Sequence, residues 1–336
     1  MRWYVMWIGR VVFGFGGESL SVAQSAMIAK WFVGKELALA LGMNLALARI
    51  GSVINDLVSI KVANAYHVYD ALWVGFLVCI MSLVATICRE EDCHKVHLPP
   101  SQPNSTPHPI PTSLERVGRL TGKVYEPEPE EIDLKAVFRF PLIFWILTGS
   151  CLTVYCTVLP FNNIASGFIT QKYLTHHPTP PSELSDHVKS EANTIMMVTY
   201  LTAGLLSPVM GGIIDRIGRR GILNVVATVL IVGVHLTFRF THFNPILPLL
   251  ILGLCYSIYA AALWPSIALV VAKEHTATAY GVVTAVQNAG LALSPVIIGM
   301  LQNTCDGKYD CVENFFIILG ALGIAFGLWL NVEDKR

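Results

Sequence analysis

The amino-acid sequence predicts an all-α, polytopic membrane protein, and two observations carry that prediction. Of the 336 residues, 54% are hydrophobic and 14% are charged, whereas a soluble domain typically has about 25% charged residues. Nine segments also supply the roughly 20 apolar residues that a helix needs to cross a bilayer. These predicted helices occupy residues 3–32, 36–62, 70–88, 141–166, 191–214, 221–240, 245–272, 276–302 and 313–332.

The nine segments fall into three predicted regions. Residues 1–88 hold three spans, residues 89–140 form a linker, and residues 141–336 hold six spans. The linker is rich in proline and acidic near its end, a composition typical of a disordered segment. Predicted loops on the linker's side carry 15 lysines and arginines, and those on the other side carry six. Because positive charge favours the cytosolic side, the linker and the C-terminus are predicted to be cytosolic and the N-terminus is not.

Several classes of function are not favoured. The formal net charge is zero, and no block of lysine and arginine resembles a patch that binds nucleic acid. The sequence contains no nucleophile-elbow, zinc-protease or phosphate-loop motif, so neither an enzyme nor a bound cofactor is predicted. The potential zinc ligands that lie near one another are Cys88, Cys93, His94 and His97. Their spacing matches no common zinc site, so no metal site is predicted.

Two charged residues, Glu18 and Arg49, lie near the middle of the first two predicted spans. A charge at a helix centre costs about 2.5–3.5 kcal/mol on insertion scales, so such residues mark pathways or pair with one another. Counted from the loop between the two spans, Glu18 is about 14 residues deep and Arg49 about 13, which places both about 20 Å from that surface. The sequence therefore predicts a polar site at the bilayer midplane, with a structural ion pair as the alternative.

Residues 211–220 (GGIIDRIGRR) resemble the G-x-x-x-D-R-x-G-R-R signature of the major facilitator superfamily. Glycines let two helices approach closely, and Asp215 can pair with an arginine or with a helix N-terminus in one conformation. An ordinary basic cytosolic loop is the alternative. The resemblance assigns conformational gating to Gly211, Asp215, Arg216, Gly218, Arg219 and Arg220.

Residues 10–16 (RVVFGFG) look like the fourth-helix motif of the same superfamily, R-x-x-x-G-x-G. This similarity adds Arg10 to the gating residues and predicts that it faces the bundle interior. In that register the nine spans are equivalent to helices four to twelve of a major facilitator bundle, and the first three helices are missing. Six segments are further similar to the lysosomal dipeptide transporter branch of the superfamily: 16–24, 31–37, 48–52, 263–265, 278–281 and 287–290.

This resemblance implies a multi-pass protein of the lysosomal membrane that carries dipeptides. Transport would be uniport by alternating access, in which two halves rock about a midplane site. The implied partners are dipeptides, the lipid bilayer and a glycosylated single-span lysosomal accessory protein. Two alternatives stay open: a truncated isoform that does not transport or acts as an assembly partner, and a carrier of small organic anions that bind at Arg49.

The two midplane charges suit the two ends of a dipeptide. We expect Glu18 to receive the amine and Arg49 the carboxylate, which a guanidinium can bind bidentately. Four further residues lie in spans that should line the cavity, although each such residue is more often a packing or interhelical contact. They are Trp264, Tyr256, Gln287 and Asn288.

The chemical state of three residues in the C-terminal region depends on the compartment or the helices that surround them. Cys305 and Cys311 flank a short polar loop and would form a disulfide if that loop faces an oxidising compartment. His235 lies in a predicted span and could titrate near lysosomal pH. A lone histidine within a span is more often bonded to a neighbouring helix, which is the alternative for this residue.

Overall fold

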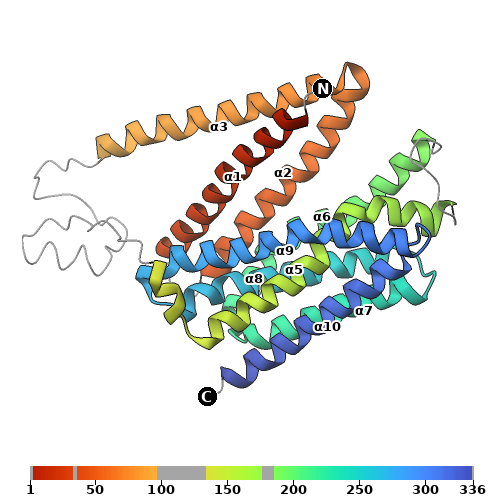
Figure 1. Ribbon diagram of the computed structural model, residues 1–336. Helices are drawn as coiled ribbons and strands as arrows, with labels where there is room; N and C mark the ends of the chain where they lie inside the picture. The colour runs from red at the N-terminus through yellow and green to blue at the C-terminus, as the bar shows by residue number, and fades with distance from the viewer. Residues whose placement is uncertain (1–2, 33–35, 97–133, 176–184, 335–336) are drawn as a thin grey trace, which may run out of the picture. The chain divides into compact units, whose positions relative to one another are not determined.

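The computed structural model describes residues 3–32, 36–96, 134–175 and 185–334, and this part of the chain is helical and contains no strand (Figure 1). The predicted all-helical fold is confirmed, because each predicted span corresponds to one of nine long α-helices in the described ranges. They are α1 (Trp3–Trp31), α2 (Leu37–Ala65), α3 (Val68–Val96), α5 (Leu142–Ile169), α6 (Asp186–Ile217), α7 (Arg220–Phe240), α8 (Ile246–Val270), α9 (Thr276–Thr304) and α10 (Asp310–Glu333). Shorter segments are η1 (Leu134–Arg139), the π-helix η2 (Thr170–Thr175) and η3 (Lys273–His275).

Eight helices in the described ranges are long and apolar enough to cross a membrane. The long helix outside this set is α1, which carries Arg10, Glu18 and Lys30. α3 continues to Val96, eight residues beyond its predicted end at residue 88. Most of the predicted linker, residues 97–133, lies outside the described residues. The division into regions 1–88, 89–140 and 141–336 therefore stays a prediction.

The chain forms two compact units. One comprises Met1–Val53 and Asp133–Arg336, and the other comprises Ile54–Ile132, so the division falls within α2. In the second unit the apolar window of α3 is 0% buried. Two of its rings, Trp73 and Phe76, pack edge to face with their centres 5.5 Å apart.

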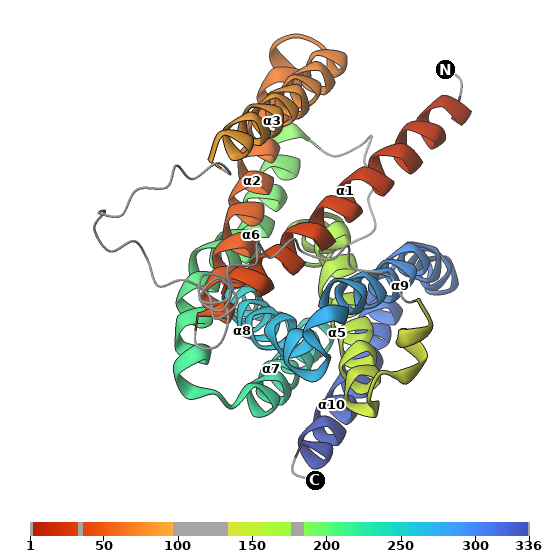
Figure 2. The same cartoon turned by 90° about the vertical axis from the view of Figure 1, so that its left-hand side faces the viewer.

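The core of the first unit is built by six helices, α5 to α10 (Figure 2). α8 packs against α6 and α7, while α10 packs against α5 and α7. α5 and α8 each bury 67% of their apolar windows, so these two helices form the centre of the bundle. Fully buried aromatic side chains fill the space between the helices, among them Phe144, Phe161, Tyr259, Tyr280 and Phe316.

Glycines allow α10 to lie directly against α7. A Cβ on Gly320 would come 2.5 Å from a methyl group of Val232, and one on Gly327 would come 2.9 Å from a methyl group of Val225. Small residues at such contacts let helix backbones approach closely, which increases the packing of the neighbouring side chains.

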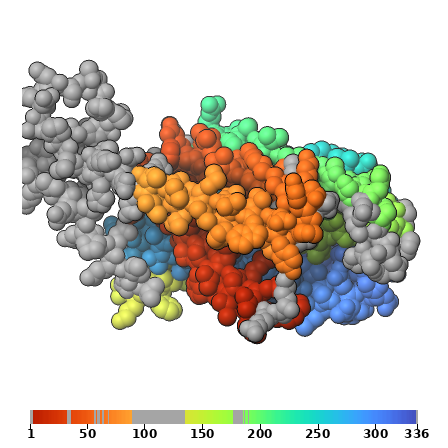
Figure 3. Space-filling model, turned by 90° about the horizontal axis from the view of Figure 1, so that it is seen from above, coloured from red at the N-terminus to blue at the C-terminus, as the bar shows by residue number. Residues whose placement is uncertain are grey.

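α1 and the first part of α2 join the same unit. α1 packs against α9, and Figure 3 shows its surface in red beside the blue of the C-terminal helices. Its buried residue is Ala26, near its C-terminal end. The buried apolar residues of α2 within this unit are Leu37, Ala38, Leu41, Ala46 and Val53. This packing places the helix that carries Arg49 against the C-terminal bundle.

Candidate functional site

Arg49 connects α2 to two helices of the C-terminal bundle. Its Nη2 donates a hydrogen bond to the hydroxyl of Tyr256 on α8. The guanidinium carbon lies 4.9 Å from the ring centre of Tyr256 and 5.8 Å from that of Tyr200 on α6, within the range of a cation–π attraction. Gly204 on α6 lies beside the arginine, and a Cβ there would be 3.4 Å from Arg49 Cβ. The two tyrosines thus hold the positive charge between α6 and α8.

Arg49 has no acidic partner among the described residues. Ion pairs in this part of the chain include Arg220–Asp215, His235–Glu313, Arg239–Asp310 and His187–Glu191. The Nε of Arg49 is buried and has no hydrogen-bond partner, and a buried polar group left in this way costs about 1–3 kcal/mol. Arg49 can therefore offer both a charge and a donor to an anionic group.

Tyr155 on α5 extends the aromatic cluster around Arg49. Its ring centre lies 5.7 Å from that of Tyr256 and 6.0 Å from that of Trp264, edge to face in both cases. Trp264 Nε1 also donates a hydrogen bond of 2.6 Å to the Tyr155 hydroxyl. Arg49, Tyr256 and Trp264 therefore belong to one network of contacts. No sequence signal distinguishes Tyr155 or Tyr200 from the other tyrosines of apolar spans.

The remaining predicted substrate-binding residues lie outside this network. Glu18 is exposed on α1 and forms no ion pair with Arg49. Gln287 is buried on α9, where its Oε1 lies 3.8 Å from the Sγ of Cys151. Asn288, on the same helix, is half-buried. The structural ion pair between Glu18 and Arg49, which was the alternative to a binding site, is not formed in this structure.

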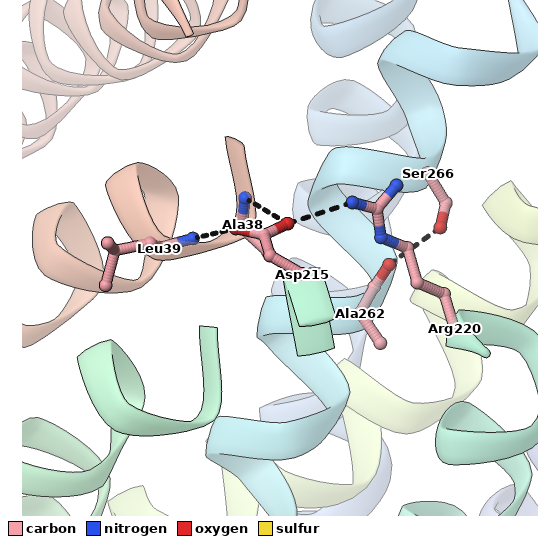
Figure 4. A network of polar contacts seen from close by, with 6 residues as sticks. All are labelled: Ala38, Leu39, Asp215, Arg220, Ala262 and Ser266. Carbon is pink, nitrogen blue, oxygen red and sulfur yellow. Dashed lines mark hydrogen bonds and ion pairs between the residues drawn. The ribbon is translucent and has the colours of Figure 1, made fainter. Parts of the chain in front are cut away.

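Asp215, the acidic residue of the 211–220 motif, links α6 to the start of α2 (Figure 4). Its carboxylate accepts hydrogen bonds from the backbone N–H groups of Ala38, at 3.2 Å, and Leu39, at 2.9 Å. Arg220 Nη2 lies 3.1 Å from the same carboxylate, and the Asp215 side chain is 4% exposed. The first N–H groups of a helix lack acceptors within the helix and carry partial positive charge. Asp215 thus binds an arginine and a helix N-terminus at once.

α2 and α6 approach closely beside Asp215. A Cβ on Gly211 would lie 2.8 Å from the carbonyl carbon of Ala38, and one on Gly42 would lie 2.5 Å from the carbonyl oxygen of Ser207. Side chains do not tolerate such contacts with backbone atoms, so both positions require glycine for the helices to remain this close. This approach brings the Ala38 N–H within reach of the carboxylate.

The other residues assigned to gating have different surroundings. Gly218 ends α6 with a φ of 71°, a left-handed conformation that glycine adopts without strain. Arg216 and Arg219 are exposed. Arg10 is exposed as well, and its orientation toward the bundle interior stays a prediction. The buried residue of α1, Ala26, lies near the opposite end of the helix.

Cys305 and Cys311 form a disulfide between α9 and α10, as expected for a loop in an oxidising compartment. The loop that they close is also fastened to η2, because Gln171 Nε2 donates a hydrogen bond of 3.0 Å to the carbonyl oxygen of Gly307. Within the first unit, this end of the C-terminal bundle lies opposite the end that holds Asp215.

Comparison with known proteins identifies the family. The family model described as Major Facilitator Superfamily matches residues 1–177 and 176–336. The lysosomal dipeptide transporter MFSD1 of Bos taurus is 32% identical over 331 residues, which cover 96% of this chain and 63% of that protein. The Homo sapiens protein of the same name is 31% identical over 342 residues, covering 99% of this chain and 66% of its own length. The Gallus gallus protein is 30% identical, covering 93% and 65% respectively.

This chain therefore spans slightly less than two thirds of the length of the curated relatives that it matches. The family model, in contrast, matches it from one end to the other. Together with the eight apolar helices in the described ranges, this match establishes a multi-pass membrane protein that belongs to the Major Facilitator Superfamily.

Proposed function

We propose that this chain moves dipeptides across the lysosomal membrane as a uniporter that works by alternating access. Membership of the superfamily supports transport rather than catalysis. The three relatives, which match at least 93% of the chain, carry the name lysosomal dipeptide transporter. Because the chain spans less than two thirds of their length, the substrate, the mode of transport and the membrane are proposals about the whole protein.

The observation that carries this proposal is the state of Arg49. Its guanidinium is held by two tyrosines, has no acidic partner among the described residues, and keeps its Nε buried without an acceptor. The carboxylate of a dipeptide would supply the missing acceptor and the missing negative charge together. Charge-assisted hydrogen bonds of this kind are about twice as strong as neutral ones.

Glu18 is proposed to bind the other end of the dipeptide. Its carboxylate is exposed on α1 and forms no ion pair with Arg49, so it is accessible to a substrate ammonium group. Recognition of the amine and the carboxylate leaves the side chains of the dipeptide loosely specified, which predicts a broad range of dipeptides. Trp264, Gln287 and Asn288 are proposed to line the same cavity.

Asp215 is proposed to act as a gate on the cytosolic side. Its carboxylate joins α2 to α6 through two backbone N–H groups and to α7 through Arg220. An opening between α2 and the C-terminal bundle at this end must break the two hydrogen bonds to the backbone of α2 and separate Gly211 from Ala38. Substrate release to the cytosol would therefore require a conformation in which Asp215 has exchanged these partners.

Thermal unfolding of the purified protein tests substrate binding directly. A ligand at about 100 times its Kd adds about 2.7 kcal/mol of stability when it binds only the folded state. We expect dialanine to raise Tm and its C-terminal amide, which lacks the carboxylate, to have no effect. Equal stabilisation by the acid and the amide would contradict the role proposed for Arg49.

Arg49→Ala and Arg239→Ala form a matched pair of variants for this experiment. Arg239 pairs with Asp310 at 3.2 Å, far along the chain and partly exposed, so its loss should leave the response to dialanine unchanged. Arg49→Ala should unfold at a similar temperature to the wild type without ligand but lose the response. If Arg49→Ala still responds, the carboxylate binds elsewhere.

A carrier of small organic anions is a second candidate, favoured by one observation. Arg49 contacts Tyr200 and Tyr256, whereas Glu18 forms no ion pair with Arg49. The charged group of this cluster is therefore a cation, which suits an anionic substrate. Competition decides between the candidates. A dipeptide carrier should be inhibited by dialanine but not by acetate or N-acetyl dialanine, whereas an anion carrier should be inhibited by all three.

The partner proposed for this protein is a glycosylated single-span protein of the lysosomal membrane. The proposal of this partner rests on the resemblance to the dipeptide transporter branch alone. Purification of the protein from lysosomal membranes through a tag, followed by deglycosylation and mass spectrometry, tests both the location and the partner. Recovery from another membrane would contradict the lysosomal assignment.

A further inference from the structure

Tyr155 on α5 contacts two residues of α8 that are eight positions apart. Its hydroxyl accepts a hydrogen bond of 2.6 Å from Trp264 Nε1, and its ring packs edge to face against that of Tyr256, with the ring centres 5.7 Å apart. Eight residues extend about 12 Å along a helix. One buried side chain of α5 therefore connects two different turns of α8.

Trp264, at one end of this connection, is itself held by α9. The hydroxyl of Tyr280 donates a hydrogen bond of 3.0 Å to the carbonyl oxygen of Trp264, and Tyr280 is fully buried. The rings of the two residues are also stacked, with their centres 6.0 Å apart. Trp264 is thus a fixed donor, and its hydrogen bond determines where the Tyr155 hydroxyl lies.

Tyr256, at the other end of the connection, carries Arg49. The guanidinium donates a hydrogen bond to the Tyr256 hydroxyl and lies over the ring of the same residue. Both contacts therefore change when the Tyr256 side chain moves. Edge-to-face packing of aromatic rings is favourable, so the ring of Tyr155 stabilises Tyr256 in the orientation that holds Arg49.

The orientation of Arg49 depends strongly on this arrangement. An arginine in an ion pair is oriented by its carboxylate, but Arg49 has no acidic partner among the described residues and is held by tyrosines instead. A group that binds a ligand has to be kept within about 0.5 Å of its productive position by the residues around it. The support behind Tyr256 therefore matters for binding at Arg49.

We propose that Tyr155 is a positioning residue for Arg49. Trp264 anchors the hydroxyl of Tyr155, the ring of Tyr155 orients Tyr256, and Tyr256 presents the guanidinium to the substrate carboxylate. Tyr155 acts through Tyr256 and requires no contact with the substrate. The inference rests on the proposed function for the identity of the substrate, whereas the placement of Arg49 is measurable without a ligand.

Modification of the purified full chain by phenylglyoxal, which reacts with arginine side chains, measures the freedom of Arg49 without substrate. Mass spectrometry of the peptides gives the rate at Arg49, and the exposed Arg216 and Arg219 provide reference rates. Tyr155→Phe keeps the ring but removes the hydroxyl. We expect it to raise the relative rate at Arg49 about two- to tenfold, the effect of one lost hydrogen bond. An unchanged rate would contradict the proposal.

Tyr259→Phe is the matched control. Tyr259 lies on α8, is fully buried, and forms a hydrogen bond of 2.8 Å with Ser150. Its ring also packs against that of Tyr155, with the centres 6.1 Å apart. The variant removes a hydroxyl from the same ring cluster but leaves the contacts between Trp264 and Arg49 in place, so the rate at Arg49 should not change. A rise equal to that of Tyr155→Phe would show a general effect of packing and overturn the proposal.

Trp264→Phe removes the donor instead of the acceptor and provides a second variant. It should raise the phenylglyoxal rate at Arg49 as Tyr155→Phe does, because the hydroxyl of Tyr155 loses its anchor in both. If Tyr155→Phe does not fold, Trp264→Phe decides alone, and a rate equal to that of the wild type would then refute the positioning role.

The apparent Kd for dialanine separates positioning from direct binding. Tyr155→Phe should raise this Kd about two- to tenfold in the wild-type background. In Tyr256→Leu, where the connection to Arg49 is already cut, the same substitution should have no further effect, since the effects of coupled residues do not add. Equal effects in both backgrounds would mean that Tyr155 binds the substrate itself, against the proposal. If dialanine does not bind the wild type, the proposed function fails, while the phenylglyoxal rates still decide the role of Tyr155.

Discussion

Arg49 and Asp215 both connect α2 to the C-terminal bundle, but their charges are satisfied in different ways. Asp215 is bound by two backbone N–H groups and by Arg220, and its side chain is 4% exposed. Arg49 is held by one hydroxyl and two aromatic faces, and its buried Nε has no acceptor. The hydrogen-bonding groups of Asp215 are occupied, whereas Arg49 still has an N–H donor without an acceptor.

This difference separates a residue that holds a conformation from one that can bind a ligand. The Asp215 carboxylate loses its two hydrogen bonds to the backbone of α2 when α2 and α6 part, so it favours the closed arrangement. A guanidinium that faces aromatic rings can also donate hydrogen bonds to a carboxylate, because cation–π contacts leave some of its N–H groups unused. The following predictions are ordered from the largest expected effect to the smallest.

Gly211→Ala should abolish the close contact between α2 and α6. Its Cβ would lie 2.8 Å from the carbonyl carbon of Ala38, which belongs to a helix backbone that cannot yield locally. We expect dialanine uptake into proteoliposomes to fall at least about tenfold, which corresponds to about 1.4 kcal/mol. Gly233→Ala on α7 is the control, because a Cβ there meets nothing within 4 Å. Equal uptake by both variants would contradict a role for this contact in transport.

Asp215→Asn should weaken the closed arrangement without a steric clash. The amide can still accept a hydrogen bond but loses the charge that attracts the α2 N-terminus and Arg220. Hydrogen bonds to charged groups contribute about 1.5–3 kcal/mol each, so opening should become more frequent. A cysteine at Ala46, a position that is 6% exposed, reports opening in a background whose exposed cysteines are serine. A labelling rate unaltered by Asp215→Asn would show that Asp215 does not hold α2 and α6 together.

Tyr256→Phe should reduce substrate affinity moderately. The variant keeps the ring 4.9 Å from the guanidinium carbon but loses the hydroxyl that accepts the hydrogen bond from Arg49. A typical hydrogen bond contributes about 0.5–1.5 kcal/mol, so the apparent Kd for dialanine should rise about two- to tenfold. Titration followed by thermal unfolding measures this change. A tighter Kd would mean that the tyrosine competes with the substrate for the arginine.

Tyr200→Leu should have the smallest effect. The ring of Tyr200 lies 5.8 Å from the guanidinium carbon, near the limit of a cation–π contact, which contributes about 0.5–1 kcal/mol at such sites. We expect the apparent Kd to rise about two- to fivefold in Tyr200→Leu relative to Tyr200→Phe, which retains the ring. Equal Kd values for leucine and phenylalanine would exclude a contribution from this ring.

The sequence determined the helical architecture because apolar segments of sufficient length can cross a bilayer only as helices. The sequence also indicated the partners of Asp215. The 211–220 motif predicts that its carboxylate pairs with an arginine or a helix N-terminus, and in the structure it binds both. In these cases the information is local: length, composition and the spacing of a few residues along one segment.

The tertiary structure alone decided which distant residues meet. Depth counting placed Glu18 and Arg49 at the same level, but it does not give the rotation of each helix about its axis, and Arg49 in fact meets Tyr256, 207 positions away. The partner of His235 is likewise found on α10, 78 positions along the chain. Such pairings depend on the packing of whole helices, so no local pattern of residues encodes them.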